Sequence, residues 1–149
     1  MNKVFKQFEE TMDIIQKLKE VPESQLTEAI SEGKWSIREI VGHLYYWDKY
    51  NLEEMVPLMA NGAKLPQFPN HDEHNEEAAS YIKDHSVESV IKNFIETRKE
   101  LIEAISKVGK DTRFTIGQGK RKFSDESFIK IFVKHDIHHL QQINKKLND

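Results

Sequence analysis

Apolar residues recur at spacings of three and four along four long segments of the chain, a period that places them on one face of a helix. The four helices predicted from this pattern cover residues 3–20, 37–60, 87–108 and 124–147. Shorter helices are expected around 25–31 and over 76–83. We expect no sheet. The stretch 110–123 forms either a short ribbon or an irregular loop.

Polar residues mark where the predicted helices begin. Ser36 and Glu39 are spaced as a capping box, and Trp35 and Ile40 flank them as the matching hydrophobic staple. Four amphipathic helices without a convincing sheet predict an all-α fold, a four-helix bundle. The polar stretch 61–85 predicts a long crossover between helices 2 and 3 instead of a tight hairpin.

Composition narrows the class of protein further. A chain of 149 residues predicts a single domain spanning 1–149. Its net charge of −3 argues against nucleic acid as a partner, because nucleic-acid-binding domains usually have a pI above about 9. The chain has no cysteine, and no stretch approaches the roughly 18 apolar residues of a membrane span. We therefore expect no membrane partner and a cytoplasmic location.

Seven histidines are the unusual feature of the composition. On the fourth predicted helix, His135 and His139 lie one turn apart and project inward, while His138 lies at the border with the polar face. Two inward imidazoles one turn apart can share a cation, since residues i and i+4 stack on one face. The alternative is that each is a hydrogen-bonded core residue.

The remaining histidines decide whether a third ligand exists. The segment His135-Asp136-x-x-His139 resembles a zinc-peptidase helix with Asp in place of Glu, but residues 140–149 contain no further His, Glu or Cys. A third ligand must therefore come from upstream, and His43, at the edge of the buried stripe of its helix, is the best candidate. We expect the histidines of the polar connection to be solvated, with His74 reaching the site only if that loop folds over it; they are His71, His74 and His85.

Several of these motifs together resemble the DinB/YfiT-like superfamily. They are Trp35-Ser36 at the start of a helix, His43-Leu44 two turns later, and His135-x-x-x-His139 followed by Gln142-Ile143. The resemblance covers essentially the whole chain. It implies a four-helix bundle with up-up-down-down topology, a homodimer, and a divalent metal held by His43, His135 and His139. Residues 36–59 also resemble a colibactin-resistance branch, in which the metal triad need not be kept.

The same resemblance implies a function. Relatives include metal-dependent transferases that use low-molecular-weight thiols such as bacillithiol and mycothiol, and a thiol-dependent isomerase. We therefore expect a metal-dependent enzyme that acts on a small-molecule substrate and activates either such a thiol or water. The expected ion is zinc or nickel, with iron or manganese as alternatives.

Three points stay open. Asp136 and His138 are candidates for catalytic roles, although Asp136 can equally form a salt bridge with a neighbouring helix. The basic run Lys120-Arg121-Lys122 can attract carboxylates to an open metal or lie as a solvated loop. The alternatives to an enzyme are a protein that sequesters a small molecule, and a purely structural metal that joins the second and fourth helices.

Overall fold

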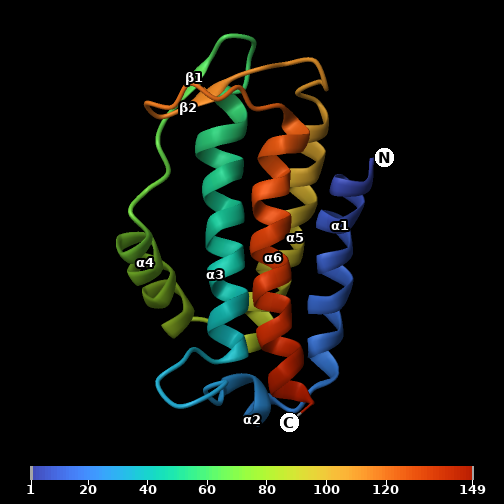
Figure 1. Ribbon diagram of the computed structural model, residues 1–149. Coiled ribbons are helices and arrows are strands. Elements are labelled where there is room, and N and C mark those ends of the chain that lie inside the picture. Colours follow the sequence, from blue (N-terminus) through green and yellow to red (C-terminus); the bar gives the residue numbers. More distant parts are fainter. Residues whose placement is uncertain (1, 149) are drawn as a thin grey trace.

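The computed structural model describes residues 2–148 and consists mainly of helices (Figure 1). The helices are α1 Lys3–Gln16, α2 Glu23–Thr27, α3 Ile37–Tyr50, α4 His71–Lys83, α5 Val87–Ser106 and α6 Asp125–Leu147. The strands are β1 Lys64–Leu65 and β2 Thr115–Ile116. Helices α1, α3, α5 and α6 form the predicted four-helix bundle, and α2 and α4 lie outside it.

Two apolar clusters fill the bundle at different heights and reveal the directions of the helices. One cluster joins the beginnings of α1 and α6 to the ends of α3 and α5, for example Phe8 and Phe128 with Trp47 and Ile105. The other joins the ends of α1 and α6 to the beginnings of α3 and α5. Helices α1 and α6 are thus parallel to each other and antiparallel to α3 and α5, as Figure 1 also shows.

The order of directions along the chain is therefore up-down-down-up, which corrects the expected up-up-down-down topology. The periodicity that predicts a helix carries no information about its direction. The predicted crossover between the second and third bundle helices is present, and the parallel arrangement of α3 and α5 requires it. The chain must return from one end of the bundle to the other between them, and α4 forms most of that return.

Helix α4 is longer than expected, since it begins at His71 and not near residue 76. Asn70 caps it by accepting hydrogen bonds from the backbone N–H groups of Asp72 and Glu73, and those two acidic residues suit the helix dipole. Helix α4 docks closely on α3 at Gly42, where any larger side chain would overlap Ile82. The polar crossover is thus an ordered wall of the bundle.

Two other elements differ from the prediction. The second bundle helix is α-helical only to Tyr50, and continues as a π-helical turn and a 3₁₀ turn to Leu58. Pro57 explains this change, because it lacks the N–H that an α-helix requires there. The short helix α2 lies a few residues earlier than the expected 25–31.

One small pair of strands accompanies the helices of this all-α fold. β1 and β2 form a two-residue parallel pair, in which Lys64 pairs with Thr115 and Leu65 with Ile116. This pair closes the end of the bundle opposite α2 (Figure 1). Within residues 2–148, no helix is both long and apolar enough to cross a membrane.

Candidate metal centre

Three histidines from two helices meet in the middle of the bundle. His43 lies on the second turn of α3, and His135 and His139 lie one turn apart on α6. One ring nitrogen from each can be chosen so that all three lie within 4.8 Å of one another. The Nε2 atoms of His43 and His135 are 2.9 Å apart. We call these three residues the histidine triad.

Burial keeps the triad in its neutral form. His43 and His139 are each 7% exposed, and His135 is half-buried. Burial, together with repulsion from His139, lowers the pKa of both His43 and His135 to about 3. The Asn75 side chain opposes this fall at His43. Burial also lowers the pKa of His139, opposed by the hydrogen bond that His139 donates to Gln142. At neutral pH the three rings therefore present lone pairs instead of positive charge.

The surroundings orient the rings to different degrees. Nδ1 of His139 lies 2.7 Å from Gln142 Oε1, and since a carbonyl oxygen only accepts, Nδ1 carries the proton and Nε2 is left as the acceptor. The Trp35 ring stacks on His139 at 6.3 Å and is tilted against His43 at 4.9 Å. Nδ1 of His43 is buried and has no hydrogen-bond partner among the described residues.

Next to the triad lies a second buried polar group, centred on an arginine of α5. Arg98 is 1% exposed and forms ion pairs with Asp48 of α3 and Asp136 of α6, both at 2.7 Å. Thr11 of α1 donates its hydroxyl proton to Asp136 Oδ2 at 3.0 Å. We call these four residues the arginine cluster. Of the two roles considered for Asp136, the structure therefore shows the salt bridge with a neighbouring helix.

The arginine cluster is saturated with hydrogen bonds. The guanidinium donates two to Asp48, two to Asp136 and one to the carbonyl of Phe8, which accounts for all five of its N–H groups. Its carbon lies 3.6 Å from the centre of the Phe8 ring and 4.8 Å from that of Phe94. The cluster joins all four helices of the bundle between the two apolar clusters.

Of the histidines outside the triad, some lie where the sequence predicts them and one does not. His138 is exposed, as its border position predicts, and its ring lies 5.0 Å from that of His139. His74 is not a solvated loop residue: it lies on α4, is 4% exposed and packs on Trp47 with ring centres 4.1 Å apart. His71 is exposed, and His85 stacks on Tyr81. Because α4 begins directly after Asn70, His74 is a helical residue, and it lies on the face that packs on Trp47.

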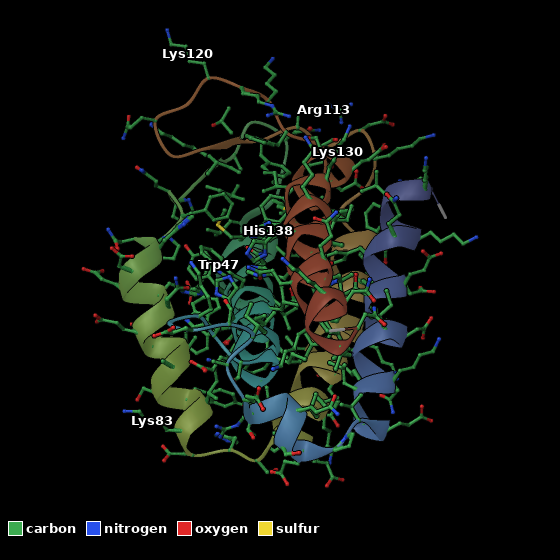
Figure 2. All side chains as sticks on the ribbon, turned by 60° about the horizontal axis from the view of Figure 1, so that its bottom comes forward. Trp47, Lys83, Arg113, Lys120, Lys130 and His138 are labelled. Atoms are coloured by element: carbon green, nitrogen blue, oxygen red, sulfur yellow. The ribbon has the colours of Figure 1, made fainter. Side chains whose placement is uncertain are left out.

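The aromatic residues that follow His43 on α3, and the basic run at residues 120–122, are not part of the triad. Trp47 is a core residue, whereas Tyr46 and Tyr50 line a surface pocket of about 330 Å³ next to His74. The exposed basic run at residues 120–122 lies in the loop before α6. Figure 2 shows Lys120 at the far end of the bundle and His138 nearer its middle, so the basic run does not flank the triad.

The donor set of the triad fits a divalent transition metal. Neutral imidazole nitrogens are good ligands for zinc, nickel, copper and iron. Metal–nitrogen bonds of roughly 2.1 Å place two donors on one ion about 3.3–4.2 Å apart. Separations of 2.9 Å to at most 4.8 Å are close enough to this range that small ring rotations bring all three nitrogens onto one ion. Three protein ligands leave at least one coordination position for another molecule.

Sequence reasoning missed the arginine cluster, although Arg98 carried a signal. It stands on the apolar stripe of its helix, four residues after Phe94 and three before Leu101. Asp48 likewise follows the buried Leu44 by four residues. A charged residue in the middle of an apolar face indicates a buried ion pair, because such residues are almost never fully buried alone.

Comparison with known proteins supports the fold. YfiT from Bacillus subtilis, described as a probable metal-dependent hydrolase with an unusual four-helix bundle topology, is 19% identical with a TM-score of 0.66; the match covers 98% of this chain and 87% of that chain. A mycothiol-dependent maleylpyruvate isomerase is 16% identical with a TM-score of 0.65, and the match covers 94% of this chain and 62% of the isomerase chain. A search of curated proteins gave no significant match.

Identities this low show a shared fold and leave the chemistry open. The family itself is decided by a different comparison, which covers most of the chain. The family model described as the DinB superfamily matches residues 7–143, from the first turns of α1 to the last turns of α6. The chain therefore belongs to the DinB superfamily.

Proposed function

We propose that the protein binds one divalent metal ion through His43, His135 and His139, and uses it to activate a low-molecular-weight thiol or a water molecule. The observation that carries this proposal is the convergence of three neutral imidazoles within 4.8 Å in the bundle. Zinc or nickel is the expected ion, since imidazole suits both, with iron or manganese as alternatives.

The chain supplies ligands but no thiol of its own. A divalent ion at such a site supplies Lewis acidity, which lowers the pKa of a thiol or a water molecule. Because the chain contains no cysteine, a thiol nucleophile must come from a second substrate. The similar chains described as a probable metal-dependent hydrolase and as a mycothiol-dependent maleylpyruvate isomerase support water and thiol chemistry, respectively.

The neighbouring residues favour a cation and orient its ligands. With both carboxyls ionised, the arginine cluster has a formal charge of −1, and its Asp136 lies on the helical turn between His135 and His139. Gln142 holds His139 with Nε2 free. His138, exposed beside His139, is the candidate for moving a proton between substrate and solvent.

The proposal is tested with protein purified without a histidine tag, stripped of metal and reconstituted with Co²⁺, whose absorption reports the coordination number. Conjugation of bacillithiol, mycothiol or glutathione to monochlorobimane then reports thiol transfer. We expect a three-histidine spectrum that changes on adding thiol, and conjugation that disappears in His135→Gln and persists in His71→Gln. His71 is an exposed histidine outside the triad.

Three outcomes would change this account. Failure of both the native and the reconstituted protein to bind metal would refute it. Metal binding without an open coordination position would favour a structural metal that joins α3 and α6. Ligand-induced thermal stabilisation that survives His135→Ala with His139→Ala would favour a protein that sequesters a small molecule.

A further inference from the structure

Two residues that line the same small cavity between α3 and α4 each have a buried polar atom without a partner among the described residues. His43 Nδ1 and Asn75 Oδ1 have no hydrogen-bond partner among the described residues. Both residues line a cavity of about 20 Å³, walled otherwise by Trp35, Ala78 and Ile82 among others. The two atoms are complementary, since an imidazole nitrogen can donate a proton and an amide oxygen accepts one.

The cavity has room for one water molecule. A water needs roughly 10–15 Å³ of such space and two to four polar partners, and this cavity of about 20 Å³ provides His43 Nδ1 and Asn75 Oδ1 as two of them. Buried polar atoms are ordinarily satisfied by protein or by ordered water. A donor, an acceptor and a space of this size therefore indicate a water-bridged hydrogen bond.

The other end of the triad shows what such a bond does. Gln142 Oε1 takes the Nδ1 proton of His139 and leaves its Nε2 as an acceptor. Metal-binding histidines are usually held by a hydrogen bond at the nitrogen that does not bind the metal. His43 has only the side of its ring that faces Asn75 for this purpose, because its Nε2 lies 2.9 Å from His135.

We propose that Asn75 is a positioning residue of the histidine triad: its Oδ1 takes the Nδ1 proton of His43 through one water molecule and so leaves His43 Nε2 free to bind a metal. The role in metal binding rests on the proposed function, whereas the hydrogen bond itself does not. In the metal-free protein, the proton between the Nε2 atoms of His43 and His135 then belongs to His135, because two neutral rings need one donor.

Helix α4 is held firmly enough to give Asn75 this role. Gly42, the residue before His43, admits Ile82 of α4 against the α3 backbone. Arg38 of α3 donates hydrogen bonds to the carbonyls of Ile82 and His85 at the end of α4. The crossover helix is thus anchored on the helix that carries His43, and supplies the outer support for the site.

The experiment compares Asn75→Ala, which removes the acceptor, with Asn75→Asp, which keeps one. Glu76→Ala, an exposed neighbour on α4, is the matched control. Long-range ¹H–¹⁵N correlation spectra of the metal-free proteins report which nitrogen of His43 carries the proton. A competition titration with a chromophoric chelator reports Zn²⁺ affinity, and circular dichroism reports folding of each variant.

We expect wild-type His43 to carry its proton on Nδ1, and Asn75→Ala to move a large share of it to Nε2. Zn²⁺ affinity should fall about 10–100-fold in Asn75→Ala, as for other residues that support ligands. It should recover in Asn75→Asp and stay unchanged in Glu76→Ala. A merely structural role for Asn75 would change the melting temperature without moving the proton.

The two proposals fail in different ways. If the wild type binds no metal, the proposed function is wrong, and the position of the His43 proton still decides whether Asn75 bonds to it. If the wild type binds Zn²⁺ and Asn75→Ala binds it equally well with the same tautomer, the inference about Asn75 is overturned and the proposed function stands.

Discussion

The middle of the bundle contains two buried polar groups that differ in how fully their hydrogen bonds are satisfied. In the arginine cluster, all five N–H groups of Arg98 donate to oxygen atoms. In the histidine triad, Nδ1 of His43 lacks a partner among the described residues, and two Nε2 atoms face each other. A saturated cluster has no capacity left for a ligand, whereas neutral rings with free lone pairs do.

This difference assigns the arginine cluster a role in stability and the histidine triad a role in binding. Charged groups kept in a protein interior must be paired, and removing one partner leaves the other charge buried. Burial raises the pKa of Asp48 to about 6 in spite of Arg98 beside it, so Asp48 depends on this guanidinium to stay ionised. The triad contains no charge to compensate. Its replacement should therefore affect binding more than folding.

The largest expected effect on folding comes from Arg98→Met, which leaves two carboxyls buried without their cation. The free energy of unfolding of the metal-free protein should fall by about 3–5 kcal/mol, measured by urea denaturation. Lys99→Met, at the exposed next position, is the control. Should Arg98→Met not fold, adding Asp48→Leu and Asp136→Leu should restore folding, because no uncompensated charge remains. Equal stability of Arg98→Met and Lys99→Met would contradict the assignment.

Metal binding at the histidine triad should stabilise the folded protein. It should not act on the arginine cluster. At a free Zn²⁺ concentration of about 100 times Kd, the free energy of unfolding should rise by about 2.7 kcal/mol, and a chelator should reverse the gain. His135→Gln should abolish this gain while leaving the metal-free stability within about 1 kcal/mol of wild type. A chelator-sensitive melting temperature that persists in His135→Gln would place the metal elsewhere.

Mild acid should weaken the metal-free protein through the triad. His43 and His135 have a pKa of about 3 in the folded protein against a reference value of 6.5, so only the unfolded chain takes up these protons as pH falls below 6.5. Stability is therefore full above pH 6.5 and declines toward pH 3. From pH 7 to 5.5 the loss should be roughly 2–3 kcal/mol, a little over 1 kcal/mol for each of the two histidines. His135→Leu should reduce this slope, and an unchanged slope would argue against neutral buried rings.

The smallest expected effect comes from the rim of the arginine cluster. Thr11→Val removes one of the hydrogen bonds to Asp136 and leaves the ion pair intact. The free energy of unfolding should decrease by about 1 kcal/mol, the usual net contribution of one hydrogen bond. Urea denaturation measures it, and a loss as large as that of Arg98→Met would mean that the ion pair depends on Thr11.

The sequence predicted the parts of the molecule that local pattern determines. Helical spacing and caps such as Ser36 located the bundle helices, and the inward faces of α3 and α6 identified the histidines that meet. Tertiary contacts determined the rest. The directions of the helices depend on packing, and Pro57 altered the end of α3. Arg98 is buried only because Asp48 and Asp136 reach it from two other helices.

The central claim is that the histidine triad, and not the charged cluster beside it, is the binding centre of this bundle. Isothermal titration of metal-free protein with Zn²⁺ tests it most directly, in wild type, His135→Gln and His138→Gln. We predict one ion per chain in wild type and in His138→Gln, whose substituted residue is exposed, and none in His135→Gln. Absence of binding in the wild type, or binding that His135→Gln leaves intact, would contradict the account.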